Sequence, residues 1–269
     1  KAHITLKKGG FPAMKKKRYI LIFSFVFQLF LFHSVVSAAV MVTLHTAGPV
    51  SSRSMQQVTM AIHMTSSYMQ QHFHLDFRDN IDLTVASSKQ NFRQLNADRH
   101  ITGNISGGST YRHITVYIPI GASQAYTTGL VAHELAHQYQ FLIVPPNLLA
   151  KNMWFGEGMA DLLAAHITAS LQTTRMNQFQ QNAWNKTQAD ELSLSEITTQ
   201  TGWSKYFGAG RPTYAKADLA VLYLEQSYGE KKLFEYIRRL RNQDANEAMQ
   251  ATYGISINEL EQKLKDTDS

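Results

Sequence analysis

The sequence contains no cysteine among its 269 residues. Without thiols the chain forms no disulfide bonds, and a zinc site with thiolate ligands is excluded. Exported proteins, particularly those that cross a single membrane, often dispense with disulfides. The lack of cysteine is therefore consistent with a protein that works outside the cytoplasm.

A basic surface of the kind that binds nucleic acid is also missing. The net charge of +6 arises near the N-terminus, because residues 1–38 hold seven lysines and arginines and no acidic residue. Of the 26 basic residues, 19 remain after these seven are subtracted, against 20 acidic residues. No basic stripe interleaved with aromatic residues is left, so we expect no nucleic-acid partner. The sequence also has no internal repeat and no low-complexity segment.

A long apolar run lies near the N-terminus. Met14 begins the string Met-Lys-Lys-Lys-Arg, an apolar run covers 19–36, and the small residues Ser37 and Ala38 follow. A positively charged segment, an apolar segment and small residues before a cleavage site are the three parts of a signal peptide. The pattern predicts a signal peptide over 14–38, with cleavage after Ala38 or one residue later.

An uncleaved membrane anchor is the alternative for this segment, because the run is close to the roughly 20 residues that span a bilayer. Only in that case do we expect the membrane to be a partner. Residues 1–13 precede the expected natural start and are interpreted as upstream, non-native sequence. In either case we expect residues 39–269 to form one domain that is secreted or otherwise extracytoplasmic.

The hydrophobic spacing beyond residue 39 changes repeatedly between helix and strand patterns. Apolar residues three or four apart predict a helix over 51–74, and alternation predicts strands over 81–86 and 111–120. The other expectations are a short helix over 90–95, a turn or loop over 103–109, a loop-rich stretch over 185–206, a loop over 202–210, and helices over 214–228, 231–241 and 257–265. The order indicates an α+β fold.

The string His133-Glu134-Leu135-Ala136-His137 has the spacing of a metal chelate. Residues four apart lie about 40° apart on one face of a helix, so His133 and His137 can direct ring nitrogens at one ion. Glu134 points to the flank of that pair, where it can take a proton from water without becoming a ligand. The string predicts two zinc ligands and a general base.

A second string, Trp154-Phe155-Gly156-Glu157-Gly158-Met159-Ala160-Asp161, supplies further carboxylates. A catalytic zinc has three protein ligands and keeps its fourth position for water. Glu157, at the start of an Ala-rich helical stretch, is the predicted third ligand. Asp161 lies one turn later and can accept the second N–H of a ligating histidine, which would fix its tautomer.

Two solvated histidines on a surface helix are the alternative interpretation of the first string. The flanking stretches 129–132 and 138–142 are uncharged and mostly apolar, so this helix is expected to be buried. Burying two imidazoles and a carboxylate without a metal ion or tight partners is costly. The flanks therefore favour a metal site.

The two strings together resemble the gluzincin metallopeptidases, the group that includes thermolysin and the M1 aminopeptidases, and especially compact bacterial relatives with a peptidase MA-like domain. The resemblance covers roughly residues 125–264 and includes the segment 211–225. It implies a thermolysin-like catalytic domain, with a small N-terminal mixed sheet, then the active-site helix, then a helical C-terminal part. It also implies a zinc-dependent peptidase that acts on peptides or proteins.

Further roles come from this resemblance alone. In M1-type relatives a Tyr at the position of Tyr214 donates a hydrogen bond to the tetrahedral intermediate; Tyr206 is a weaker candidate for that role. In gluzincins the strand before the active-site helix is the sheet edge that binds substrate, which places Thr115 to Pro119 there, with Thr115 and Tyr117 as substrate-binding residues. Backbone pairing of this kind binds peptides with little sequence preference.

Two features depart from the M1 pattern. The sequence has no Gly-x-Met-Glu-Asn string before His133, the element with which M1 aminopeptidases hold a free amine, which weakens an exopeptidase interpretation. The spacing from His137 to Glu157 matches thermolysin-like enzymes better. A non-enzymatic surface protein that retains a metalloprotease-like fold remains the alternative to an exported zinc peptidase.

Other histidines are weaker metal candidates. His72 and His74 alternate around Phe73, but the nearest carboxylate, Asp76, has no obvious partner to complete a site. His166 follows Glu157 by nine residues, which is about 180° around a helix, so it is expected to point away from the zinc.

Overall fold

The computed structural model describes residues 42–76, 80–97, 106–188 and 190–266. These residues all belong to one unit, Val40–Ser269. The predicted signal segment 14–38 lies outside the described residues. Within the described ranges, none of the helices has the length and apolar character needed to cross a membrane.

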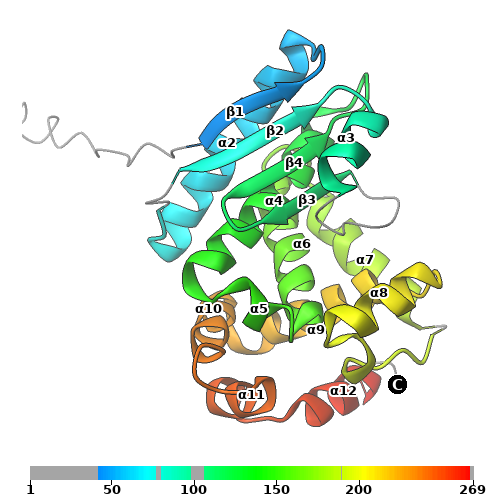
Figure 1. Ribbon diagram of the computed structural model, residues 1–269. Helices are drawn as coiled ribbons and strands as arrows, with labels where there is room; N and C mark the ends of the chain where they lie inside the picture. The colour runs from blue at the N-terminus through cyan, green and yellow to red at the C-terminus, as the bar shows by residue number, and fades with distance from the viewer. Residues whose placement is uncertain (1–41, 77–79, 98–105, 189, 267–269) are drawn as a thin grey trace, which may run out of the picture. The chain divides into compact units, whose positions relative to one another are not determined.

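A four-stranded mixed sheet forms the N-terminal part (Figure 1). Its strands are β1 (Val42–Ala47), β2 (Ile81–Ala86), β3 (Gly107–Thr110) and β4 (His113–Tyr117), in the order β1-β2-β4-β3. β1 pairs with β2 and β2 with β4 in parallel, whereas β3 pairs with β4 antiparallel. The predicted strand over 81–86 is confirmed, and Leu83, Val85, Ile114 and Val116 are buried with the period of two that strand geometry requires.

Two expectations for this region were wrong in part. The predicted strand over 111–120 is shorter, because Tyr111 and Arg112 form a turn in which Arg112 has a φ of 65°. Residues 107–109, predicted to lie in a loop, begin strand β3, because β4 offers them a backbone to pair with. β3, not β4, is therefore the edge of the sheet on this side.

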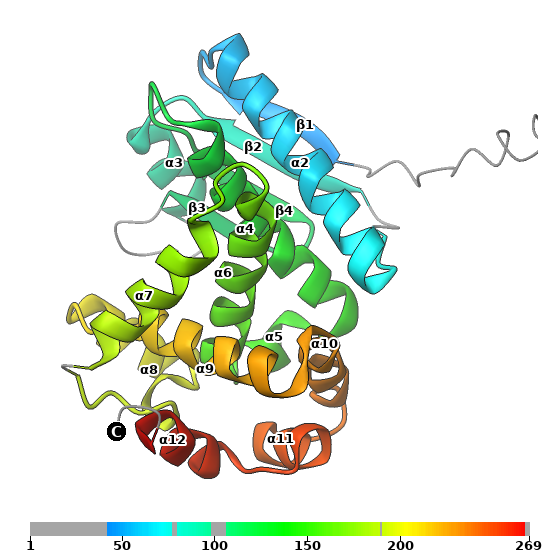
Figure 2. The ribbon, with the colours of Figure 1, turned by 180° about the vertical axis from the view of Figure 1, so that it is seen from behind.

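Helices α2 (Ser52–Phe73) and α4 (Gln124–Ile143) lie on one face of the sheet, behind it in Figure 1 and in front of it in Figure 2. α2 begins after Ser51, whose side chain accepts a hydrogen bond from the backbone N–H of Ser54 at 3.1 Å. Val58, Ile62 and Met69 are buried at helical spacing, as the sequence predicts. α3 (Lys89–Asn96) packs against β2 and β4.

Three helices form the centre of the C-terminal part. α6 (Met153–Ala169) packs against α4 on one side and α9 (Thr213–Tyr228) on another. Small residues allow this close packing: a β-carbon on Gly158 would lie 2.5 Å from the backbone oxygen of Ala217. Since α4 and α6 are both covered by other elements, polar side chains on their facing surfaces are shielded from bulk water.

The remaining helices surround this centre. They are α5 (Pro146–Leu149), α7 (Arg175–Thr187), the 3₁₀ turn η2 (Ser195–Ile197), α8 (Gln200–Gly208), α10 (Glu230–Arg239), α11 (Ala245–Tyr253) and α12 (Ile257–Asp266). The loop predicted over 202–210 is wrong, because most of it is α8, which buries Trp203. The predicted fold class, a small mixed sheet followed by helices in an α+β arrangement, is confirmed.

Candidate active site

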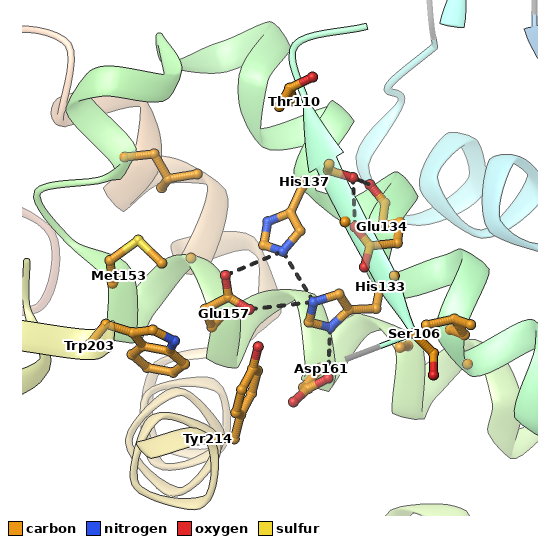
Figure 3. A pocket seen from close by; sticks show the side chains of 18 of the residues that line it. Ser106, Thr110, His133, Glu134, His137, Met153, Glu157, Asp161, Trp203 and Tyr214 are labelled. Atoms are coloured by element: carbon orange, nitrogen blue, oxygen red, sulfur yellow. Dashed lines mark hydrogen bonds and ion pairs between the residues drawn. The ribbon is translucent and has the colours of Figure 1, made fainter. Parts of the chain in front are cut away.

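The two histidines of the first string lie one turn apart on α4 and face α6 (Figure 3). Their Nε2 atoms are 3.1 Å apart. The carboxylate of Glu134 points elsewhere, toward β3. The spacing of the string thus has the effect expected from helix geometry: two imidazoles converge and the carboxylate between them does not.

Glu157 reaches the same point from the first turns of α6. Its Oε2 lies 3.4 Å from Nε2 of His133, and its Oε1 lies 3.6 Å from Nε2 of His137. Ligands at about 2.0–2.1 Å from a tetrahedral zinc ion are separated from one another by about 3.3 Å. The separations, of which the two to Glu157 involve different carboxylate oxygens, are close to those between the ligands of a tetrahedral ion, and the described residues offer no fourth protein ligand.

The hydrogen bonds of the two rings determine which nitrogen of each is available. Nδ1 of His133 donates to Oδ1 of Asp161 at 2.7 Å, because a carboxylate can only accept. Nδ1 of His137 donates to Oε1 of Gln140 at 2.9 Å, and the amide group of Gln140 donates in turn to the backbone oxygen of Gly156 at 2.8 Å.

With both Nδ1 atoms acting as donors, the Nε2 lone pairs of the two neutral rings face each other. Such lone pairs repel unless a cation lies between them. This arrangement is therefore stable only with a metal ion or a shared proton between the two rings. Two imidazoles and one carboxylate, with an open fourth position, are the ligand set of a catalytic zinc. The residues therefore fit a zinc ion.

The surrounding charges also favour a cation at this point. Burial alone would lower the pKa of His133, but Asp161, Glu157 and Glu134 raise it well above its ordinary value. Burial alone would raise the pKa of Glu157, yet His137 and His133 lower it. Three carboxylates thus create a negative potential where the two Nε2 atoms meet.

Glu134 is held by β3. The hydroxyl of Ser109 donates to Oε2 of Glu134 at 2.7 Å. Burial raises the pKa of Glu134, against the opposing effects of His133 and His137. A buried carboxylate with a raised pKa is a better proton acceptor than a solvated one. The sequence did not reveal Ser109, because its glycine-rich surroundings indicate a turn.

Tyr214 enters the site from the first turn of α9, with its hydroxyl pointing toward Glu157 (Figure 3). Trp203 and Phe207 pack edge-on against its ring, with centroids 4.9 Å and 5.6 Å away. Burial and the carboxylates of Glu157, Asp161 and Glu134 raise its pKa well above the ordinary value. Tyr214 therefore keeps its proton and can donate it in a hydrogen bond.

Tyr206, the other tyrosine considered for this role, is occupied elsewhere. Its hydroxyl donates to Oε1 of Glu196 at 2.7 Å, and it is not among the residues that line the cleft. The structure thus brings Tyr214, and not Tyr206, next to the converging histidines.

Asp218 lies beside Asp161 and was not identified from the sequence. It lies one turn after Tyr214 on α9 and is partly buried, and burial and the neighbouring Asp161 raise its pKa well above the ordinary value. A protonated Asp218 can donate a hydrogen bond to Asp161, which also accepts from Nδ1 of His133. The spacing in the sequence indicates this position, because a carboxylate four residues after Tyr214 shares its face of the helix.

The site opens into a cleft of about 1020 Å³. Strand β3 forms one wall, and Phe141, Leu149, Met153, Trp203 and Phe207 contribute apolar surface to the cleft. The cleft therefore combines the edge strand of the sheet with an apolar pocket beside the histidines.

The predicted substrate-binding residues Thr115 and Tyr117 are not in this cleft, and this prediction is corrected. They lie on β4, which is flanked by β2 and β3, so the backbone of β4 is already paired on both sides. Thr115 is buried. The free edge belongs to β3, which only the tertiary pairing could show.

Comparison with known proteins found one family model. A family model described as the Peptidase MA superfamily matches residues 81–267, which include every element from β2 to α12. No curated protein matches the chain.

Proposed function

The chain belongs to the Peptidase MA superfamily, and from this premise we propose that it is an exported, zinc-dependent peptidase with Glu134 as its general base. The observation that carries the proposal is the convergence of His133, His137 and Glu157: the two Nε2 atoms are 3.1 Å apart and lie 3.4 Å and 3.6 Å from the two carboxylate oxygens. Glu134 lies beside these atoms and not among them, as a base must.

The residues divide the chemistry of peptide hydrolysis among them. His133, His137 and Glu157 would hold the zinc ion, which would supply a Lewis acid for the scissile carbonyl and for the attacking water. Glu134 takes the proton of the attacking water and later passes it to the leaving amine. Ser109 orients the carboxylate of Glu134 through its 2.7 Å hydrogen bond.

Tyr214 completes the site as a donor. Its protonated hydroxyl donates to the oxygen that gains negative charge as the carbonyl is attacked. The packing of Trp203 and Phe207 on the ring holds the hydroxyl in place before the reaction, so little reorganisation is required.

The substrate is a peptide or protein that lies along β3. An extended chain can pair with the free edge of Gly107–Thr110, which provides backbone hydrogen bonds without a sequence requirement. The apolar side chains that line the cleft then contact the substrate side chains on the other side of the histidines.

Export is proposed from the sequence alone, on the pattern of residues 14–38. A non-enzymatic surface protein with the same fold is less well supported, because such a protein would have no reason to retain Glu134, the hydroxyl of Ser109 that orients it and the hydrogen-bonded histidines together.

The substitution Glu134→Gln tests the proposal. The amide keeps the shape and the hydrogen bond from Ser109 but cannot accept a proton, so we expect the variant to fold, to retain zinc in this site and to lose cleavage of casein. Glu191→Gln changes an exposed glutamate and is the matched control. Cleavage at the wild-type rate by Glu134→Gln would overturn the assignment.

A peptide library profiled by mass spectrometry adds the substrate information. Wild type and Glu134→Gln are incubated with the same library, with and without a chelator. We expect cuts that require both Glu134 and metal, and their positions in the peptides separate endopeptidase from exopeptidase action.

A further inference from the structure

A second cluster of metal-binding side chains lies on the side of α6 that faces away from Glu157. His166, nine residues after Glu157, points away from the catalytic histidines, as its helical position predicts. Ligand atoms of His166, Glu225 and Glu230 all lie within 4.8 Å of one another, the same criterion that His133, His137 and Glu157 satisfy. Nε2 of His166 is 2.7 Å from Oε1 of Glu225.

His72, on α2, contacts one of these ligands but is not one of the three residues of the cluster. Nδ1 of His72 is 3.3 Å from Oε2 of Glu230. The ring of Tyr68 stacks on the ring of His72, with centroids 4.0 Å apart, and the Tyr68 hydroxyl donates to the other oxygen of Glu230. Tyr68 and His72 therefore orient Glu230, as residues around a metal site commonly do for its ligands.

The charges of the cluster are those of a cation site. In the described part of the chain, the ion pairs of Glu225 and Glu230 are made with His166 and His72, and neither carboxylate pairs with lysine or arginine. Two carboxylates near one another repel unless a positive charge lies between them. One imidazole with two carboxylates is a ligand set that suits zinc.

The distances agree with a tetrahedral ion after a small adjustment. Adjacent ligands of zinc are about 3.3 Å apart, as bond lengths of 2.0–2.1 Å require. The separation of His166 and Glu225 is 2.7 Å, so an ion that replaces their shared proton must push them about 0.6 Å further apart.

We propose that His166, Glu225 and Glu230 form a second zinc site, outside the cleft, with His72 and Tyr68 orienting Glu230. Three ligands come from protein, and the fourth position is left for water. The site joins α6 to the later helices α9 and α10. The three side chains are 13–26% exposed, which leaves a path for the ion to enter.

Metal content tests the proposal directly. Purified protein is loaded with zinc, passed through a desalting column and analysed by mass spectrometry of the metal. We expect two zinc ions per wild-type chain and one for Glu225→Gln. His63→Ala is the matched control, since His63 is an exposed histidine of the same helix as His72, and it should retain two.

A variant of the catalytic site separates the two centres. His133→Ala should retain one zinc ion, and added zinc should still raise its melting temperature. In the double variant His133→Ala/Glu225→Gln the bound zinc and the zinc-induced shift should both be lost. Glu225→Gln alone should continue to cleave casein, whereas Glu134→Gln should keep both ions, so a failure of the proposed reaction leaves this test intact.

A stoichiometry of one in the wild type that falls to zero in His133→Ala would overturn the second site. His166 would then be a protonated partner of Glu225 in an ion pair without metal. If Glu225→Gln does not fold, His166→Ala replaces it, because His166 is the more exposed of the two, and it should weaken the zinc-induced shift measured in the His133→Ala background.

Discussion

Gly107 approaches Glu134 so closely that a β-carbon at position 107 would lie 2.2 Å from Oε1 of the carboxylate. Only glycine leaves room for the proposed base at this point of β3. Ser109, two residues later, donates a hydrogen bond to the other oxygen, Oε2. Strand β3 therefore leaves space for the carboxylate of Glu134 at Gly107 and orients it through Ser109.

Gly107→Ala should displace the carboxylate of Glu134 and leave the fold in place, because the nearest atoms belong to the end of a side chain that can move. A displacement of about 1 Å in a reacting group costs about a hundredfold in rate, so we expect kcat/KM to fall by about that factor. Steady-state kinetics and zinc content measure it. Gly208→Ala, where a β-carbon meets no atom within 4 Å, is the control; equal activity in both variants would contradict the role of Gly107.

Asp161→Asn should weaken zinc binding at the catalytic site. The amide oxygen can still accept from Nδ1 of His133, as the carboxylate does at 2.7 Å, but it carries no negative charge to make the ring a stronger ligand. Loss of such a partner lowers metal affinity by about 10- to 100-fold, which competition with a chelator measures. Asp82→Asn removes a carboxylate that pairs with surface histidines, His45 and His113, and should leave the affinity of this site unchanged. An unchanged affinity in Asp161→Asn would show that the bond does not support the metal.

Tyr214→Phe should lower kcat with a much smaller effect on KM, because the hydroxyl acts only on the charge that develops during the reaction. Removing one donor of this kind costs about 10²–10³ in kcat. The ring contacts with Trp203 and Phe207 remain, so stability should change little. Tyr206→Phe, which removes a hydroxyl bonded to Glu196, is the comparison; a larger loss of kcat there would reverse the assignment.

Asp190→Asn should destabilise the protein at neutral pH and not at low pH. Hydrogen bonds from Arg211 lower the pKa of Asp190 below its ordinary value of 3.8. A carboxyl group with a lowered pKa in the folded state stabilises the protein above that ordinary value, and the contribution disappears as pH falls through the folded pKa. We expect the variant to melt a few degrees lower at pH 7, with the difference shrinking below about pH 4.

Thermal melting from pH 7 to pH 3 checks this. Glu191→Gln, a change at the next, exposed position, should match wild type throughout. A difference between Asp190→Asn and wild type that stays constant down to pH 3 would exclude the ionised pair as its cause. The pair matters for the site because Arg211 precedes the helix that carries Tyr214.

Local periodicity explains which features could be predicted. His133 and His137 converge because residues four apart share a helix face, whatever surrounds the helix. The strand over 81–86 and the helix over 51–74 follow from apolar spacing in the same way. Gln140 was within reach of the same reasoning, three residues after His137, but it was overlooked because an uncharged amide gives no signal of a metal site.

Contacts between distant segments explain what could not be predicted. The sequence around Ser109 predicts a loop. Ser109 is part of β3 because the backbone of β4 pairs with this segment. Because of the same pairing, the edge strand is β3 and not β4, the strand that holds Thr115 and Tyr117. His72 and His166, each unremarkable in its own segment, meet carboxylates of α9 and α10 only after the helices have packed.

The sequence by itself determined the features that depend on neighbouring residues. These are the absence of thiols, two imidazoles and a carboxylate at helical spacing, and the pair of carboxylates one turn apart in the second string. Helix geometry alone positions these groups relative to one another. The tertiary structure decided how the carboxylate of Glu157 meets the two histidines, which strand lies at the edge of the sheet, and which glycine lies against Glu134. These are contacts between residues that are distant in the sequence. They arise from packing, so no short-range sequence pattern predicts them.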